Sequence, residues 1–482
     1  MDLIWIASRI LLVFQWVSIV YFLGLATIYM TLVLIGFFEM FRYRSARRER
    51  EDADAINGCG IAPPISVLAP AHNESATICE SVRSLLSLSY AQFEVIVIND
   101  GSTDNTLELL VREFHLYRSA RYVEERLATK PVRGVYQSMY PIPLVVIDKE
   151  NGGKADALNA GINAARNPLV CSIDADSLLE QNALIRVVRP LLDDPERVLA
   201  VGGIIRIANG CESSSGRVVK VGLPESWLAR FQVVEYLRAF LGGRVAFSAL
   251  NSLMIVSGAF GLFNKAAVLA VGGYDTDTVG EDMELIVRLH RWAREQRKPY
   301  RIVFEPDPVC WTEAPESLKV LERQRKRWQR GTVETLWKHR DVVMRPGYGM
   351  LGWFAMPYFV VFEGLGPFIE CGGYLATIAG LLFGLIDFDS STLFFVTAVL
   401  NGMVLSASCV VLEELSTRRY PQVKNLATLL VAAFLENLGF RQMMTFWRAT
   451  AIIDLLRGDK SWGVMERKGF GARRVAAEDA RN

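Results

Sequence analysis

The feature that most constrains this chain is a long uncharged apolar stretch near its N-terminus. No residue from Ile10 to Phe38 carries a charge, and roughly 20 apolar residues are enough to cross a bilayer as a helix. The apolar core of a cleaved signal peptide is usually only about 7–15 residues long. We therefore predict a retained transmembrane helix within residues 1–42. The arginines at positions 42–50 predict that its C-terminal end faces the cytoplasm.

A second apolar region covers residues 346–456 and predicts roughly three to five further membrane segments. Its first part is interrupted by Pro357, Glu363, Pro367 and Glu370. Such breaks suit either interfacial or re-entrant helices that line a cavity, or a kinked helix whose carboxylates meet neighbouring helices. The polar, arginine-rich residues 457–482 predict a cytoplasmic C-terminal tail.

The middle of the chain, residues 43–345, has the pattern of a cytoplasmic α/β domain. Short apolar runs lie at 65–69, 93–98, 144–147 and 169–173, and the first three are followed by helical patterns at 75–88, 104–114 and 154–165. This alternation predicts buried parallel strands in a Rossmann-like mixed sheet. Because ligands of such sheets bind at the carboxyl ends of the strands, we expect the polar clusters after these runs to converge in one crevice.

Charge and cysteine content argue against several classes of protein. The 53 basic and 52 acidic residues leave a net charge of +1, so no global basic field predicts a nucleic-acid partner. The seven cysteines show no C-x-x-C spacing. A disulfide framework or a zinc site is therefore not predicted.

Asp174 and Asp176 directly follow the run at 169–173. Two carboxylates one residue apart can share a hard divalent cation, which in turn holds phosphate oxygens. The competing interpretation is a helix N-cap before Ser177.

The clusters after the second and third runs have similar alternatives. Asp100, within Asn99–Asp104, is either part of a turn or a hydrogen-bond acceptor for a nucleobase. Lys154 follows two glycines and begins a helical pattern. It is either a phosphate ligand beside a helix N-terminus or a solvated surface lysine.

Two later motifs carry further candidates. Glu281 and Asp282 open an amphipathic helix, where a carboxylate can act as a general base toward a sugar hydroxyl or simply favour the helix dipole. The basic segment around Gln324 either lies on anionic lipid or offers Arg327 to a diphosphate and Trp328 to a sugar ring.

Five of these motifs stand in a fixed order along the chain: Pro70-Ala-His-Asn-Glu74, Asn99-Asp-Gly-Ser102, Asp174-Ala-Asp176, Glu281-Asp282 and Gln324-x-x-Arg-Trp328. Together with the flanking membrane segments, they resemble the processive membrane synthases of glycosyltransferase family 2, which make cellulose, hyaluronan, chitin and poly-N-acetylglucosamine. The resemblance implies a GT-A type nucleotide-sugar-binding domain plus transmembrane helices. It also implies a multi-pass protein of a bacterial inner membrane, with the catalytic domain in the cytoplasm.

The resemblance further implies roles for individual residues. The nucleotide-sugar donor would contact Ala71, Asn73, Glu74, Asp100, Lys154, Asp174 and Arg327. Mg²⁺ or Mn²⁺ would bind Asp176 and Asp174, and Asp282, beside Glu281, would be the catalytic base. Trp328, Gly258 and Phe260 would contact the growing glycan. Inversion at the anomeric carbon of a donor, UDP-linked by resemblance, would give a β-linked polymer that the membrane helices carry outward.

Two other functions remain open from the sequence. One is a non-processive transferase that makes a single lipid-linked sugar, and the other is a non-catalytic membrane assembly subunit. The sugar and its linkage are not readable from these motifs, and accessory secretion or regulatory subunits are compatible with them.

Overall fold

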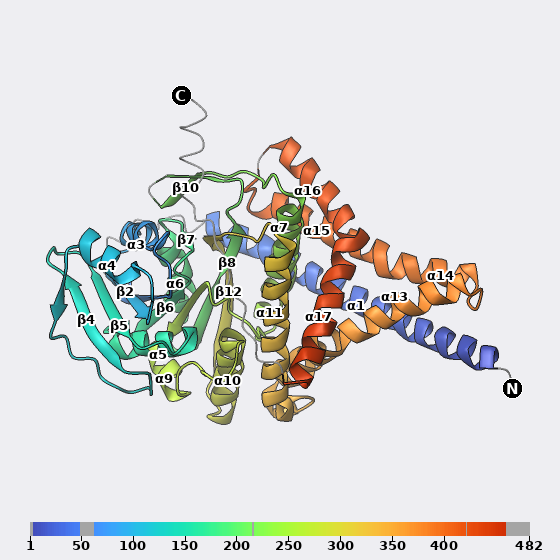
Figure 1. Cartoon of the computed structure of the whole chain (residues 1–482), viewed down its shortest axis with the longest axis horizontal. Coiled ribbons are helices and arrows are strands. Elements are labelled where there is room, and N and C mark those ends of the chain that lie inside the picture. The colour runs from blue at the N-terminus through green and yellow to red at the C-terminus, as the bar shows by residue number, and fades with distance from the viewer. Residues whose placement is uncertain (1–2, 49–61, 215, 421, 459–482) are drawn as a thin grey trace. The chain divides into compact units, whose positions relative to one another are not determined.

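The structure, a computed structural model, describes residues 3–48, 62–214, 216–420 and 422–458 (Figure 1). These residues form two compact units. The sheet unit contains residues 46–48, 62–224 and 251–314, and the helical unit contains residues 3–45, 225–250 and 315–458. Residues 225–250 and 315–345, which the sequence analysis assigned to the α/β domain, thus group with the membrane helices. Most of the predicted tail, residues 459–482, lies outside the described residues.

The four predicted strands form the parallel centre of the sheet unit. They are β1 (Ile65–Ala71), β2 (Phe93–Asp100), β5 (Leu144–Lys149) and β6 (Leu169–Ile173), in the spatial order β5-β2-β1-β6. Their residues are almost all buried because helices cover a parallel sheet on its faces. The prediction of a mixed α/β sheet is confirmed.

Three connecting helices follow these strands as predicted: α3 (Ile78–Leu86), α4 (Thr106–Glu113) and α5 (Lys154–Ala164). Helix α5 is buried over nearly its whole length. A side chain at Gly161 would lie 2.9 Å from Ile98 and 3.2 Å from Leu68, so this glycine allows α5 to pack closely across β1 and β2.

The sheet is larger than the sequence pattern predicts, with ten strands in the order β3-β4-β5-β2-β1-β6-β11-β8-β12-β7 among the described residues. The added strands are β3 (Leu116–Ser119), β4 (Val132–Ser138), β7 (Leu178–Leu179), β8 (Val198–Ile207), β11 (Phe260–Asn264) and β12 (Arg301–Thr312). Strands β3 and β4 are antiparallel and half-exposed. Their mixed polar sequence therefore lacks the continuous apolar run of a central strand.

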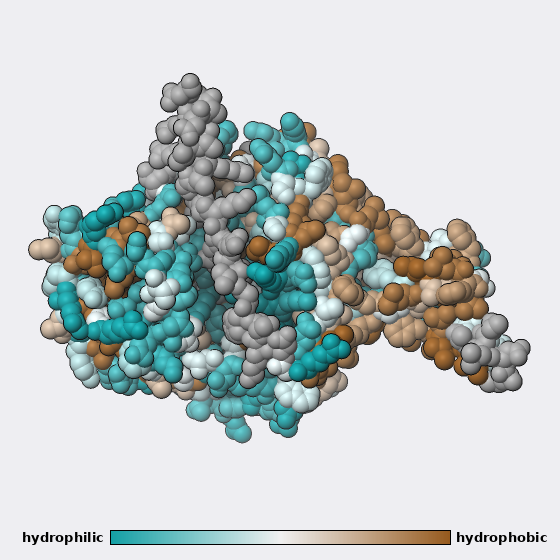
Figure 2. Space-filling view, in the orientation of Figure 1, coloured by the Kyte–Doolittle hydropathy of each residue, from teal (hydrophilic) through white to brown (hydrophobic). Residues whose placement is uncertain are grey.

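In the helical unit, four helical runs are long and apolar enough to cross a membrane: Ser8–Ser45, Leu351–Leu382, Phe388–Ser416 and Val423–Leu456. The first run lies within α1 (Leu3–Arg48). The others contain α13 (Gly366–Leu382), α14 (Phe388–Phe395), α15 (Asn401–Ser416), α16 (Val423–Leu435) and α17 (Arg441–Leu456). Figure 2 shows hydrophobic residues gathered over α13 and α14. Leu375 and Phe388 are 68% and 77% exposed there, as suits a lipid-facing surface.

The run Leu351–Leu382 is one bent helix, interrupted by wide π-helical turns at Leu351–Ala355 and Phe359–Leu365. Pro357 and Pro367 account for the irregularity because proline removes a helical hydrogen bond. The carboxylate of Glu363 pairs with Arg448, and that of Glu370 accepts hydrogen bonds from Tyr21 and Thr445. The structure thus agrees with a kinked helix whose carboxylates meet neighbouring helices.

The last run, Val423–Leu456, is broken in its middle. Leu438 (φ −111°, ψ 80°) and Gly439 (φ 105°, ψ −51°) leave the helical conformation, so α16 and α17 are separate segments. Helix α17 packs along α11 (Leu318–Lys338), which is rich in charge, and it runs across the direction of α1 and α13 in Figure 1. A charged helix is costly in the hydrocarbon layer. The run Leu351–Leu382 also contacts α11, through Phe359–Leu365, so both of these runs lie against a charged helix.

Candidate active site

The loops after β1 and β2 are joined through one asparagine. Asn73 has a left-handed backbone (φ 57°), and its side-chain oxygen accepts a hydrogen bond from the Thr103 amide at 2.8 Å. Its own amide donates to the Ser102 hydroxyl at 3.0 Å. Asparagine tolerates this conformation better than most residues. The two loops, which hold Ala71, Glu74 and Asp100, therefore form one continuous rim at the carboxyl edge of the sheet.

Glu74 and Ala71 occupy this rim in different ways. The Glu74 amide donates to the Thr106 hydroxyl at 3.0 Å, and its carboxylate accepts from the Thr77 hydroxyl at 3.1 Å. Ala71 is the last residue of β1 and is buried. The side chain of Ala71 thus lies beneath the rim that the two loops form.

Asp100 ends β2, is buried, and has partners for both carboxylate oxygens. One oxygen accepts from the Lys149 ammonium at 2.7 Å and from the Gly152 amide at 3.0 Å. The other accepts from the Gly153 amide at 2.8 Å. In this structure the carboxylate therefore holds the glycine turn before α5. Lys149 was missed by the sequence analysis because a lysine at a strand end usually reads as exposed.

Lys154, at the start of α5, lies among carboxylates rather than in open solvent. Its ammonium is 2.5 Å from Asp174, which follows β6, and 3.7 Å from Glu281 at the start of α10 (Glu281–Glu295). Desolvation lowers the pKa of Lys154, but the charges of Asp174, Glu281 and Asp282 outweigh it and raise the pKa above its ordinary value. Lys154 is therefore a fixed cation at this site, not a solvated surface lysine.

Asp282 lies on the other side of Gly258 from this lysine. One carboxylate oxygen of Asp282 accepts from the Gly258 amide at 3.0 Å, and the other accepts from the Met283 amide at 2.8 Å. A side chain added at Gly258 would lie 2.9 Å from the Lys154 ammonium and 3.5 Å from the Asp282 carboxylate. Glycine at this position thus keeps open the space between a cation and a carboxylate.

The sheet register explains why these distant residues meet. Strand β11 runs antiparallel to β6, with Phe260 opposite Ile173. The two residues before β11, Gly258 and Ala259, and the residue just after β6, Asp174, therefore lie at the same edge of the sheet. This brings Gly258 to Asp174, although 84 positions separate them in the sequence.

The loop before α10 is also tied to the sheet unit. The side chain of Asn159 in α5 accepts from the Tyr274 amide at 2.7 Å and donates to the Tyr274 carbonyl at 2.8 Å. Arg288 donates to the carbonyls of Val271 and Gly273 at 2.5 and 2.8 Å. The sequence analysis missed Asn159 and Arg288, because nothing local in a helix reveals a partner that lies in a separate loop, which for Asn159 is 115 residues away.

Asp174 and Asp176 lie in a tight turn between β6 and the short strand β7, and both are half-buried. Residues 178–179 are strand, so the alternative of a helix N-cap before Ser177 is wrong. No group of three or more His, Cys, Asp or Glu side chains arranged to hold a metal occurs among the residues that the structure describes. The two aspartates suit a Mg²⁺-like ion that takes its remaining ligands from phosphate and water.

Three candidate residues, Phe260, Arg327 and Trp328, have surroundings that differ from those of the residues around Gly258. The Phe260 side chain is fully buried, and a side chain at Gly203 of β8 would collide with it. Phe260 is thus a core residue behind the site, contrary to the expectation that it contacts a glycan. Arg327 and Trp328 lie on α11 of the helical unit, both exposed, with the Arg325 guanidinium 4.4 Å from the Trp328 ring centroid.

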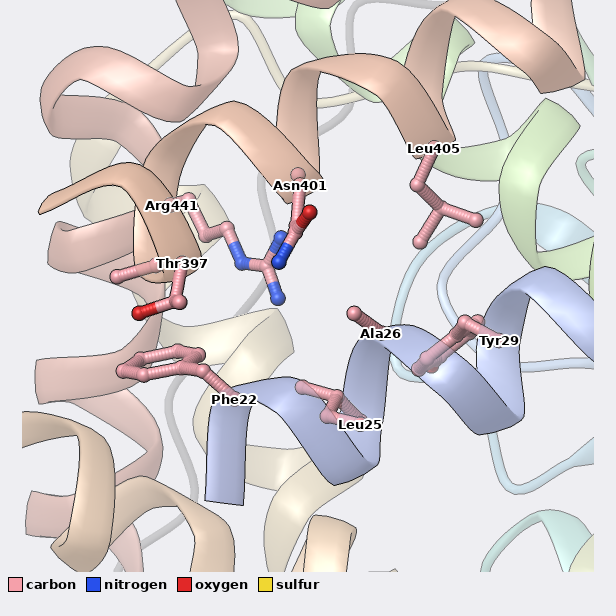
Figure 3. A pocket seen from close by; sticks show the side chains of 10 residues that line it. Phe22, Leu25, Ala26, Tyr29, Thr397, Asn401, Leu405 and Arg441 are labelled. Atoms are coloured by element: carbon pink, nitrogen blue, oxygen red, sulfur yellow. The ribbon is translucent and has the colours of Figure 1, made fainter. Parts of the chain in front are cut away.

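The helical unit contains a small pocket, open to its surroundings, between α1, the α14–α15 run and α17 (Figure 3). Its lining mixes apolar and aromatic side chains, including Phe22 and Tyr29, with the polar side chains Thr397, Asn401 and Arg441. The guanidinium of Arg441 points into the space between Thr397 and Asn401. Polar groups facing a cavity within membrane helices are costly, which favours a functional role for them.

Comparison with known proteins identifies the family. Residues 63–331, more than half of the chain, match the sequence model described as glycosyltransferase-like family 2. The chain belongs to the family 2 glycosyltransferases. Residues 278–475 of this glycosyltransferase also match a model described as chitin synthase.

Curated relatives include the poly-beta-1,6-N-acetyl-D-glucosamine synthase of Staphylococcus aureus, 31% identical over 296 residues, which are 61% of this chain and 59% of the relative. The synthase of the same name from Staphylococcus epidermidis is 32% identical over 272 residues, 56% of this chain and 55% of the relative. The matches thus span little more than half the length of these relatives.

A solved mannosyltransferase from Pyrobaculum calidifontis, in complex with GDP-Man and Mn²⁺, has a similar fold. The TM-score is 0.50 at 21% sequence identity, over 86% of this chain and 99% of that chain. At this identity the similarity supports the GT-A type architecture.

Proposed function

We propose that this glycosyltransferase polymerises sugar units from a nucleotide-sugar donor into a β-linked polysaccharide and moves the product across the membrane. The observation that carries the proposal is the arrangement around Gly258, where the Asp282 carboxylate and the Lys154 ammonium lie on either side of a residue without a side chain. A carboxylate and a cation at one sheet edge suit a reaction that removes a proton and releases an anion.

In the proposed reaction, Asp282 takes the proton from the acceptor hydroxyl of the glycan. The hydroxyl oxygen forms a bond to the anomeric carbon while the bond from that carbon to the diphosphate oxygen breaks. The nucleoside diphosphate leaves with the electron pair, so an α-linked donor yields a β-glycoside. The Gly258 and Met283 amides hold the Asp282 carboxylate in place, and Lys154 attracts the phosphate charge.

We assign a divalent cation, Mg²⁺ or Mn²⁺, to Asp174 and Asp176. The fit rests on the two aspartates themselves, which follow β6 in one tight turn beside Lys154 and carry the oxygen ligands that a hard divalent cation prefers. When bound, the cation would neutralise the diphosphate of the donor. The nucleoside end of the site would consist of Asp100, Asn73 and Glu74, with the buried residue Ala71 beneath them.

The known products of the relatives, as their names give them, support N-acetylglucosamine as the transferred sugar. The two staphylococcal relatives are named for a polymer of this sugar, and the C-terminal half matches a chitin synthase model. We propose UDP-N-acetylglucosamine as the first donor to test, with Arg327 as a diphosphate ligand and Trp328 as the platform for the acceptor sugar.

For the membrane arrangement, we propose an inner-membrane protein with its sheet unit in the cytoplasm. Three crossings, with the broken run Val423–Leu456 near the surface, would leave the C-terminal tail on the same side as the sheet unit. The pocket lined by Tyr29, Asn401 and Arg441 places polar groups among these helices, and we propose that a hydroxyl-rich polymer passes beside them. Accessory subunits are compatible with this arrangement.

The test is donor turnover by the purified protein in detergent with Mn²⁺ or Mg²⁺ and a panel of nucleotide sugars. We expect nucleoside diphosphate release with UDP-N-acetylglucosamine and a product of high mass, both lost in Asp282→Asn. A single lipid-linked sugar as the only product would favour a non-processive transferase. If neither the purified protein nor membranes that contain it turn over any donor, a non-catalytic subunit is favoured and the proposal is contradicted.

A further inference from the structure

Lys149 is an unusual residue for its position, because its side chain is fully buried at the end of β5. An isolated buried ammonium is strongly unfavourable, so it must be compensated by partners. Its ammonium lies 2.7 Å from Asp100 and 2.5 Å from Asp156, and donates to the Glu150 carbonyl at 2.5 Å. One cation thus joins two carboxylates that belong to different elements, β2 and α5.

Asp100 holds the turn that leads into α5, and Asp156 packs against this turn. Asp100 accepts from the amides of Gly152 and Gly153, while Asp156 accepts from the Lys130 amide at 3.0 Å. The turn needs its glycines: Gly153 has φ +86°, and a side chain at Gly152 would lie 2.5 Å from the Asp156 carboxylate. The turn is therefore packed against the same two carboxylates that Lys149 pairs.

The residue that follows this turn is Lys154, whose ammonium lies beside Asp174. A continuous series of contacts thus runs from Lys149 through Asp100 and the glycine amides to Lys154. Without Lys149, the two buried carboxylates would repel each other, and the amides would lose the orientation of their acceptor.

We propose that Lys149 is a positioning residue, which sets the Gly152-Gly153 turn and so places the Lys154 ammonium for the donor's phosphates. This inference rests on the proposed function for its consequence in donor binding. Lys149 itself is too deeply buried to touch the donor, and it acts through Asp100 and the turn.

The test compares Lys149→Met with Lys149→Arg and with the paired variant Lys149→Met/Asp156→Asn, which removes one cation and one anion together. In full-length protein, we expect amide exchange of the peptide covering residues 150–154 to accelerate at least about tenfold in Lys149→Met, as for a turn that opens locally. Exchange within β1 should not change. Lys220→Met, at an exposed lysine paired with Glu212, is the matched control and should behave as the wild type.

The second readout is UDP binding in the presence of Mn²⁺. We expect the dissociation constant to rise at least about tenfold in Lys149→Met and in the paired variant, and to recover to within about threefold of wild type in Lys149→Arg. If the paired variant binds UDP as the wild type does, Lys149 only balances charge and the inference is wrong. Unfolding of both methionine variants would also overturn it, since Lys149 would then serve the fold as a whole. A wild-type protein that binds no UDP would count against the proposed function, while amide exchange would still judge the role of Lys149.

Discussion

The two units of this protein use buried charge in opposite ways. In the sheet unit, charged side chains gather at one edge of the sheet, where Lys154 meets several carboxylates that are still partly exposed, at 31% for Asp174 and 15% for Glu281. In the helical unit, several buried charged side chains are each matched to a partner on another helix. Arg238 with Glu436, at 2.5 Å, is one such pair.

The difference follows from what each environment offers a charge. Loops at a sheet edge remain open to water and ligands, so charges of like sign can be kept close until a substrate compensates them. Between membrane helices no water compensates a charge, and each polar group must find its partner within the bundle. Unbalanced charge thus indicates chemistry in the sheet unit, whereas balanced charge indicates packing in the helical unit.

The largest expected effect is on turnover, and it distinguishes a carboxylate of the candidate active site from a carboxylate of the helical unit. Asp282→Asn should lower turnover by about 10²–10⁴-fold, as for loss of a general base, with little change in melting temperature. Glu370→Gln, in the bundle, should retain most turnover. Steady-state donor turnover and thermal unfolding check both, with Asp277→Asn at an exposed aspartate as the control. Equal losses of turnover in Asp282→Asn and Glu370→Gln would contradict this difference between the two units.

The next effect concerns the buried pair of the bundle. Arg238→Leu leaves the Glu436 carboxylate, which is 2% exposed, without its cation. Breaking such a pair costs about 3–5 kcal/mol of the free energy of unfolding. Thermal unfolding in detergent measures this loss. The double variant Arg238→Leu/Glu436→Leu should recover much of it, and a double variant as unstable as the single one would show that the pair is not what stabilises these helices.

A buried histidine of the sheet unit gives a pH dependence. Burial lowers the pKa of His290 to about 4, and its ring lies between the Leu253 carbonyl and the Tyr300 hydroxyl. The folded state therefore favours the neutral ring. This preference for the neutral ring contributes about 3 kcal/mol to the free energy of unfolding. The contribution is fully present above pH 6.5 and is lost as the pH falls toward 4.

Unfolding measured from pH 7 to pH 4 tests this contribution. His290→Gln should show a shallower loss of stability over that range than the wild type. An unchanged slope would mean that other groups cause the acid sensitivity.

The smallest effect is a single hydrogen bond between membrane helices. Tyr21→Phe removes the hydroxyl that donates to Glu370 at 2.9 Å. Because Thr445 still donates to the same carboxylate, we expect a loss of only about 0.6 kcal/mol, the average for such bonds. Thermal unfolding beside Tyr122→Phe, at an 84% exposed tyrosine, checks it. A loss of stability as large as that of Arg238→Leu would show that the helical unit does not tolerate a buried carboxylate that has lost one of its two hydrogen-bond donors.

Much of the fold was predictable because its signals are local. The charge-free stretch predicts α1, and the β-branched runs predict the four central strands and their parallel pairing. Strands β3 and β4 were not predictable, since half-exposed antiparallel strands carry polar residues on one side. The bend at Leu438–Gly439 was also missed, because apolar composition does not distinguish one long helix from two shorter ones.

The sequence by itself offered Asp100, Lys154, Asp174 and Asp282 as candidates, each beside a structural alternative, and the order of the motifs along the chain implied their roles by resemblance to a family. Only the tertiary structure decided how they act together. The antiparallel pairing of β11 with β6 brings Gly258 between Lys154 and Asp282, and the burial of Lys149 links Asp100 to the turn before α5. Pairing between distant strands and the exclusion of water depend on contacts far apart in the chain, which no local pattern of residues encodes.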